Sequence, residues 1–284
     1  MLFLTEPLYV PRVWGSIPRR DGDLPAGEIW WVFHRGDDSA VLKDPSGSER
    51  TTVERLVSSG RLPGGSSYPV LLKTLHTADR LSVQVHPGAT GGDLRKEETW
   101  IVLSAEPGAW MMGGLKGTDR DAFLRAVKEG RAEECLRRVP LEEGDAYHIP
   151  PGTVHALGPG LTVLEVQSNC DVTYRLYDWD RRDRGGGRRE LHLKKGMNAV
   201  DWDSPGNPVP LSGDGIFRGG KLNADYSISH VSQNDTLRLP GGCIFFLCSG
   251  WALPGSELQA PACLLADSGG GSFQLGGSGY LIEP

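Results

Sequence analysis

Short apolar runs separated by turn-forming residues follow one another along most of the chain. Seven of these runs are typical of strands, and they lie at residues 68–75, 81–85, 99–103, 109–112, 146–149, 161–166 and 172–176. Apolar and β-branched residues bounded by Gly, Pro, Asn or Asp are characteristic of strands. Closely spaced short strands predict a mainly β protein, built as a β-barrel or jelly roll.

Two segments carry helix signals instead. Residues 51–54 (Thr-Thr-Val-Glu) form a capping box, and Gly60 supplies a glycine stop for the helix that this box opens. The segment 118–138 opens with a similar cap and breaks at Gly130, before a short second helix expected over 132–138. Its charged residues predict a solvated face, so we expect a small helical insert with no catalytic role.

One expected strand carries two polar side chains suited to a metal ion. Gln84 and His86 are two residues apart, so on a strand both side chains point to the same face. Val83 and Val85 then point to the opposite face, where they can pack into a sheet sandwich. Pro87 ends the run.

Two further candidates come from later strands. Glu98 begins the strand after a glycine-bearing loop, where antiparallel pairing would return it to His86, and His155 follows the rigid turn at 150–152. An amide oxygen, two imidazoles and a carboxylate suit a borderline divalent metal such as zinc, and an open position for water would make the site catalytic. The sequence shows no comparable partners for the other histidines, which are His34, His76, His148, His192 and His230.

The spacing around these residues is more specific than the residues alone. Gly144, Pro150, Gly152 and His155 reproduce the second cupin motif up to its His, although Pro159 stands where that motif has Asn. The Gln-x-His pair followed later by Glu is a variant of the first cupin motif, with a longer loop before the Glu. Together they predict a mainly β fold, a cupin-type jelly-roll barrel with a small helical insert and a second, degenerate β-lobe.

Composition narrows the functional class. The chain has 284 residues, of which 38% are apolar and 23% charged, as in ordinary globular proteins. The net charge of −6 gives no basic field for nucleic acid, and no apolar run approaches the roughly 20 residues that span a bilayer. The opening Met-Leu-Phe-Leu is too short for a signal peptide. Five cysteines without a Cys-x-x-Cys pair favour free thiols and a cytoplasmic location.

The chain divides into two parts on this evidence. Residues 1–200 are predicted to form the metal-binding cupin domain, with the helical insert near 118–138. The stretch 201–210 is interpreted as a boundary. Residues 210–284 contain strand-like runs but no matching set of His and Glu, which predicts a smaller C-terminal β-lobe without metal ligands.

These residues resemble the type I mannose-6-phosphate isomerases, in their short bacterial form. Similar runs stand at residues 68–73, 81–87, 96–100, 105–108, 113–116, 149–156 and 174–178. The resemblance is good from about residue 65 to 182, weaker towards the N-terminus, and only general in the C-terminal part.

The resemblance implies an activity and a set of site residues. It implies that one Zn²⁺ ion, or another divalent metal, is held by Gln84, His86, Glu98 and His155. It implies that Lys96 and Arg175 act on the substrate, and Lys116 is a further candidate for contacting its phosphate. The implied reaction interconverts mannose 6-phosphate and fructose 6-phosphate, small-molecule hexose phosphates, through a cis-enediol. From its position alone, Arg175 could instead pair with Asp178 or Asp180.

Several alternatives stay open at the level of sequence. Trp31 and His76 stand where the family commonly has acidic residues, so the preferred sugar phosphate is undecided. A non-catalytic sugar-phosphate-binding cupin, acting as a sensor, is the competing interpretation, whereas an iron-dependent dioxygenase would need more histidines. The base that removes the C2 proton could be a metal-bound water, Lys96, Glu97 or Asp171. The oligomeric state is undecided as well.

Overall fold

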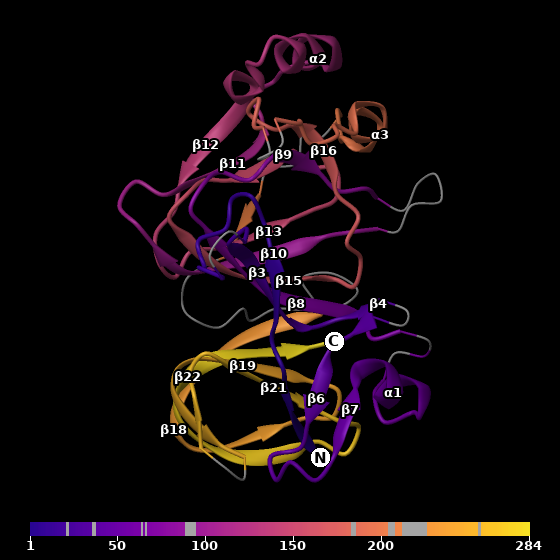
Figure 1. The fold of residues 1–284 in the computed structure, drawn as a ribbon, viewed down its shortest axis with the longest axis vertical. Helices are drawn as coiled ribbons and strands as arrows, with labels where there is room; N and C mark the ends of the chain where they lie inside the picture. The colour runs from indigo at the N-terminus through magenta and orange to yellow at the C-terminus, as the bar shows by residue number, and fades with distance from the viewer. Residues whose placement is uncertain are drawn as a thin grey trace. The chain divides into compact units, whose positions relative to one another are not determined.

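The computed structural model describes residues 1–20, 23–35, 38–63, 65, 67–88, 95–182, 186–203, 208–211, 226–254 and 257–284. Strands dominate this part of the chain, which confirms the predicted mainly β, cupin-like class (Figure 1). None of the helices in the described ranges is long and apolar enough to cross a membrane.

The strands up to the helical insert are β1 (Leu2–Thr5), β2 (Leu8–Pro11), β3 (Ala26–Val32), β4 (His34–Arg35), β5 (Asp38–Ser39), β6 (Val41–Lys43), β7 (Arg50–Thr52), β8 (Val70–Thr77), β9 (Val83–Val85), β10 (Glu98–Ala105) and β11 (Trp110–Leu115). Those after it are β12 (Leu136–Pro140), β13 (Ala146–Ile149), β14 (His155–Leu157), β15 (Leu161–Ser168), β16 (Tyr174–Tyr177), β17 (Val209–Pro210), β18 (Ser227–Leu239), β19 (Ile244–Leu253), β20 (Leu258–Gln259), β21 (Ala262–Ala266) and β22 (Gly271–Glu283). The helices are α1 (Val53–Ser58), α2 (Arg120–Lys128) and α3 (Leu193–Ala199), with a 3₁₀ turn at Ala132–Cys135.

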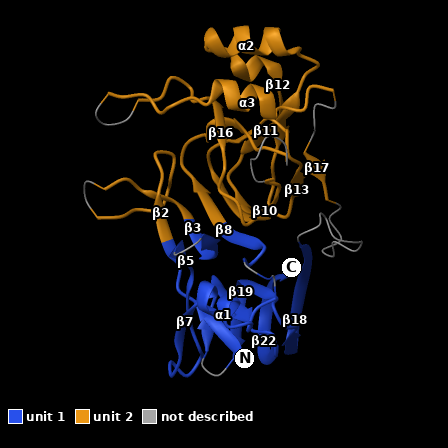
Figure 2. Ribbon diagram, turned by 90° about the vertical axis from the view of Figure 1, so that its right-hand side faces the viewer, with its two compact units in different colours: residues 1–8, 29–73, 212–284 blue, residues 9–28, 74–211 orange. Residues whose placement is uncertain are grey.

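The chain forms two compact units, which Figure 2 distinguishes by colour. Residues 9–28 and 74–211 make one unit, and residues 1–8, 29–73 and 212–284 make the other. This grouping differs from the division expected from sequence, which gave residues 1–200 to a single domain. The reason is a long-range pairing: β1 lies between β21 and β6, with Leu2 opposite Ala266. Residues 204–207 of the expected boundary lie outside the described residues.

The unit that contains the C-terminal residues is built on one antiparallel sheet, in the order β18-β22-β19-β21-β1-β6-β7, with β20 beside β19. Its core is apolar and includes Phe245, Leu264 and Phe273. Tyr68 is fully buried in this unit and donates its hydroxyl proton to the Gly242 carbonyl at 2.6 Å.

Two further sheets carry the expected ligands. The larger runs in the order β17-β13-β10-β15-β8-β3-β2, and the smaller in the order β12-β11-β14-β9-β16. The smaller sheet has two unlike faces. Val83 and Val85 pack in one apolar cluster with Phe123 of α2 and Met197 of α3. The strand alternation predicted around Gln84 therefore holds, but the valines pack against helices rather than against a second sheet.

The two segments predicted to be helical differ in detail from their prediction. Helix α1 is capped by Thr52, because Thr51 belongs to β7, and α2 is capped by Asp119 rather than by Thr118. The second helix expected over 132–138 is only a 3₁₀ turn, followed by β12. That strand pairs with β11, a non-local contact that overrides the weak local helix signal.

Helix α3 was missed from sequence because it is short and contains a central glycine. A Cβ atom at Gly196 would lie 2.5 Å from Cδ2 of Leu176 in β16, so only glycine lets the helix approach the strand this closely. Glycine in a helix interior costs about 1 kcal/mol relative to alanine. Here close packing of α3 on β16 offsets that cost.

Candidate metal centre

Three of the expected site residues form a row across the smaller sheet. His155 of β14 stands opposite Gln84 of β9, and Gln84 stands opposite Arg175 of β16 on its other side. Side chains that are directly opposed in antiparallel strands share a face of the sheet. The sheet therefore brings two expected metal ligands and the expected substrate arginine to one face, the face opposite Val83 and Val85.

A buried His-Glu-His group lies at this face. Glu98, at the start of β10 in the larger sheet, places Oε2 3.0 Å from Nε2 of His86 and Oε1 3.2 Å from Nε2 of His155. All three side chains are buried, and their possible ligand atoms lie within 4.8 Å of one another. Each residue comes from a different strand or strand end, so the centre depends on both sheets.

Main-chain carbonyls fix the orientation of both imidazoles. His86 donates its Nδ1 proton to the Val172 carbonyl at 3.0 Å, and His155 donates its Nδ1 proton to the Thr153 carbonyl at 2.9 Å. In a neutral ring the other nitrogen then carries a lone pair. Both Nε2 atoms consequently present lone pairs towards Glu98, as metal-binding histidines do.

The ionisation states of this group favour the binding of a cation. Burial, reinforced by the positive charge of Lys96, lowers the pKa of His86 to about 3, so its ring is neutral at ordinary pH. Burial alone would raise the pKa of Glu98, but the positive charge of Lys96 holds that pKa well below its usual range. The neutral His86 ring therefore faces an ionised carboxylate, and among the described residues Nε2 of His86 and Oε1 of Glu98 have no hydrogen-bond partner. A divalent cation satisfies all of these acceptors together.

Gln84, the fourth expected ligand, lies beside this group. Its Nε2 lies 3.2 Å from Nε2 of His155, and its Oε1 lies 3.4 Å from the Ser82 hydroxyl. A half-turn of the amide exchanges the two ends and presents Oε1 to the group. Two imidazole nitrogens, a carboxylate and an amide oxygen are a mixture of donors that suits zinc better than the all-oxygen shells of Mg²⁺ or Ca²⁺.

The two lysines expected at the substrate have different surroundings. Lys96 is buried, and its Nζ lies 3.1 Å from Oε2 of Glu98, inside the group just described. Lys116 follows the end of β11, is exposed, and donates from Nζ to the Glu134 carbonyl at 3.3 Å. The structure therefore brings Lys96, but not Lys116, into contact with an expected ligand.

Arg175 does not form the ion pair that its position in the sequence suggested. Asp178 instead accepts from Arg181 and Arg189, and Asp180 pairs with Arg188. Arg175 is half-buried and donates from Nη1 to the Glu190 carbonyl at 2.8 Å. Burial, and next the nearby charge of Arg189, lower the pKa of its guanidinium, although arginine stays charged in proteins.

A second buried network stands beside the group and was not predicted. Oε2 of Glu97 lies 3.2 Å from Nη2 of Arg95 and 3.4 Å from Nε2 of His148, whose Nδ1 is 3.2 Å from the Thr99 hydroxyl. His148 is thus engaged away from the metal-binding group, and Glu97, a candidate base, is committed to these neighbours. The available signal was the Glu97-Glu98 dipeptide, since consecutive residues near a strand point to opposite faces.

Comparisons with known proteins agree with this geometry. The family model described as "Phosphomannose isomerase type I, catalytic domain" matches residues 11–101. Mannose-6-phosphate isomerase ManA of Bacillus subtilis is 31% identical over 279 residues, which cover 92% of this chain and 83% of ManA.

Solved structures give the same result for the fold. The crystal structure of the mannose 6-phosphate isomerase from Bacillus subtilis has a TM-score of 0.83 and 25% identity, and covers 99% of this chain and 98% of that one. A zinc-bound mannose 6-phosphate isomerase has a TM-score of 0.70 and 13% identity, over 99% and 98% of the two chains. The second likeness concerns the fold alone.

Proposed function

This chain belongs to the type I mannose-6-phosphate isomerases, and on that premise we propose that it interconverts mannose 6-phosphate and fructose 6-phosphate. The reaction moves a proton between C1 and C2 of the sugar through a cis-enediol. The observation that carries the proposal is the buried Glu98 carboxylate, which faces two imidazole lone pairs and the Lys96 ammonium.

The donor set supports a zinc ion as the cofactor. We assign the ion to Gln84, His86, Glu98 and His155, one ion per chain. When bound, zinc supplies a Lewis acid that stabilises negative charge on the oxygens of the enediol. The carbonyls that accept from His86 and His155 keep both rings in the ligand tautomer before the ion arrives.

Two cations of the chain complete the proposed chemistry. Lys96 lies against Glu98 and brings a compact positive charge to the place where the enediolate oxygen would form. Arg175 lies in the same cross-strand row as two of the ligands, and its planar guanidinium suits a phosphate or enediolate oxygen. Lys116 remains a candidate for the phosphate only, because it is exposed and turned towards Glu134.

The departures from the family pattern have structural explanations that do not require a sensor. Trp31 is buried and packs edge-on against Phe246, with ring centroids 5.3 Å apart. His76 pairs through Nε2 with the Thr74 hydroxyl at 2.9 Å, and burial lowers its pKa. Both residues thus pack locally, while Lys96 and Arg175 are retained, so turnover is the favoured outcome over binding alone.

A cytoplasmic setting is part of the same proposal. All five cysteines are free in the structure, which supports a reducing compartment. The proposed partner is a small hexose phosphate, with no nucleic acid and no membrane.

A coupled assay tests the function directly. The purified protein, stripped of metal and reloaded with zinc, is assayed with mannose 6-phosphate and with a panel of other hexose and pentose phosphates. We expect turnover of mannose 6-phosphate that chelation abolishes and zinc restores. A zinc-loaded protein that binds mannose 6-phosphate in calorimetry but never turns it over would support the sensor instead.

A further inference from the structure

His192 completes the edge of the smaller sheet beside Arg175. The main-chain N–H of His192 donates to the Arg175 carbonyl at 2.7 Å, and the main-chain N–H of Arg175 donates to Nδ1 of His192 at 3.1 Å. β16 is an edge strand of its sheet, so these outward main-chain groups of Arg175 have no strand to pair with. His192 takes the place of a neighbouring strand. Its main-chain N–H is the donor, and its ring Nδ1 is the acceptor that a main-chain carbonyl would otherwise provide.

The same segment also holds the end of the Arg175 side chain. The carbonyl of Glu190, two residues before His192, accepts from Nη1 of Arg175 at 2.8 Å. Three hydrogen bonds thus tie residues 190–192 to the backbone and to the guanidinium of one arginine. Because His192 anchors the segment to the Arg175 backbone, it also fixes where the Glu190 carbonyl meets the guanidinium.

This arrangement leaves one donor of Arg175 without a partner. Its Nε is buried and makes no hydrogen bond within the described part of the chain. A buried unpaired donor is costly unless a ligand satisfies it. Arg175 stands opposite Gln84, so its side chain lies on the same face of the sheet as this proposed metal ligand.

We propose that His192 is a positioning residue for Arg175. By anchoring residues 190–192, His192 holds the guanidinium through the Glu190 carbonyl and leaves Nε free for an oxygen of the sugar phosphate. The inference rests on the proposed function, since it assigns a role within the same site. His192 acts through Arg175 and does not itself touch the substrate.

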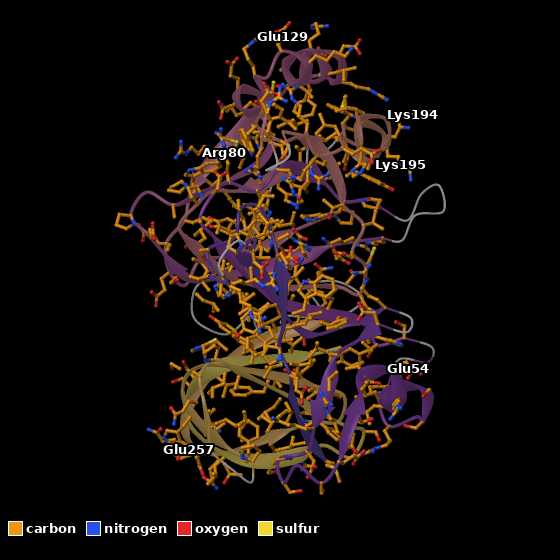
Figure 3. All side chains as sticks on the ribbon, in the orientation of Figure 1. Glu54, Arg80, Glu129, Lys194, Lys195 and Glu257 are labelled. Carbon is orange, nitrogen blue, oxygen red and sulfur yellow. The ribbon has the colours of Figure 1, made fainter. Side chains whose placement is uncertain are left out.

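The surroundings of His192 permit a clean test. Its half-buried ring lines a cavity of about 510 Å³, together with Tyr174, Lys194 and Lys195, so the ring can be replaced without cutting into the apolar core. Lys194 and Lys195, both labelled in Figure 3, belong to α3. The Nζ of Lys195 lies 5.7 Å from the centre of the Tyr174 ring and takes no part in the three hydrogen bonds. Lys195→Met is therefore a control that alters the same cavity wall.

The experiment compares three variants at His192 in the zinc-loaded protein. His192→Phe keeps a ring against Tyr174 but removes the acceptor, and we expect kcat to fall on the order of tenfold to a hundredfold with unchanged zinc content. His192→Asn places an amide oxygen close to the position of Nδ1, and we expect it to restore kcat to within about threefold of the starting protein. His192→Gln carries its amide one bond further, at the place of Nε2, and should not restore activity.

A double-variant cycle separates positioning from structure. In an Arg175→Ala background, His192→Phe should cause no further loss of kcat, because the side chain that it positions is absent. The proposal would be overturned if the fold-loss of kcat in the double variant equalled the product of the two single fold-losses. It would also be overturned if His192→Phe were as active as the Lys195→Met control. A crystal structure of His192→Phe gives a readout independent of turnover: Nη1 of Arg175 should leave hydrogen-bonding distance of the Glu190 carbonyl. An unmoved guanidinium there refutes the positioning role even in a protein without isomerase activity, whereas a zinc-loaded starting protein that does not isomerise the sugar would refute the proposed function alone.

Discussion

Nζ of Lys96 lies 3.1 Å from Oε2 of Glu98, and that same oxygen lies 3.0 Å from Nε2 of His86. A proposed metal ligand and a proposed substrate residue therefore share one carboxylate oxygen. The arrangement joins the two roles electrostatically, because a cation bound to Glu98 and His86 repels the Lys96 ammonium. That repulsion favours Lys96 turning its charge towards an anionic oxygen of the substrate.

We predict that Lys96→Met lowers kcat by roughly a hundredfold or more while zinc content stays at the level of the unaltered protein. Removing a positive charge beside the site removes a repulsion, so zinc affinity should rise slightly rather than fall. Steady-state kinetics and elemental analysis of the same samples check both parts. Loss of zinc together with activity would instead make Lys96 a structural partner of Glu98.

The adjacent carboxylates Glu97 and Glu98 should respond differently to the same change. Glu98→Gln removes the carboxylate charge that faces both imidazoles and leaves Lys96 without its buried partner, so zinc stoichiometry should fall far below one per chain. Glu97→Gln alters a carboxylate engaged with Arg95 and His148, and should retain zinc. Elemental analysis after gel filtration decides, and equal zinc in the two variants would contradict the assigned ligand set.

The sequence contained most of the information about the strands that carry the site. Gln84 and His86 could be placed on one face because strand alternation is a local rule, and the structure keeps Val83 and Val85 on the other. The approach of Glu98 to His86 was expected from antiparallel pairing of their strands, and that expectation was wrong. β9 pairs with β14 and β16, whereas β10 pairs with β13 and β15, so Glu98 reaches His86 from the other sheet.

Other features could not be predicted because they arise from contacts between distant segments. Helix α3 depends on the close approach of Gly196 to Leu176, which no local pattern reveals. The pairing of β1 with β21 moves residues 1–8 into the unit that holds the C-terminal residues. The role suggested for His192 depends on hydrogen bonds to a residue 17 positions earlier in the chain.

Gly113 of β11 stands opposite His155 of β14 and extends the cross-strand row by one strand. There is no room for a side chain at this position. A Cβ atom there would lie 2.2 Å from Cγ of Pro208, so Gly113→Ala must displace either the proline or β11. We expect the free energy of unfolding to fall by about 1–3 kcal/mol, measured by denaturant unfolding of the metal-free protein. We also expect weaker zinc binding, because β11 supports His155.

Gly88→Ala is the matched control for this change. A Cβ at Gly88 meets no atom of the described residues within 4 Å, although Gly88 lies only two residues after His86. Its unfolding free energy should stay within about 0.5 kcal/mol of the unaltered protein. If the two alanine variants prove equally stable, the contact with Pro208 does not constrain the row.

Three thiols should resist alkylation while the protein is folded. Burial raises the pKa of Cys248 and of Cys263 to about 12, and burial followed by the charge of Glu283 raises that of Cys243 to about 11, from an ordinary 9.0. Only the thiolate reacts, so near pH ~8 a thiol with a pKa of about 12 reacts roughly a thousandfold more slowly than an unperturbed one. Iodoacetamide labelling followed by peptide mass spectrometry should find these residues unmodified in native protein and modified after denaturation.

The same shifts set the direction of the pH dependence. Because each folded pKa lies above the ordinary 9.0, the neutral thiols contribute stability that is complete below about pH 9 and is lost as the pH rises through about 11 to 12. Cys263→Ala should therefore lose less stability than the unaltered protein between about pH 9 and pH 11, in denaturant unfolding at matched ionic strength. Rapid labelling of Cys263 in the native protein near pH ~8, or an identical decline in both proteins, would show that this thiol is not shielded as its burial requires.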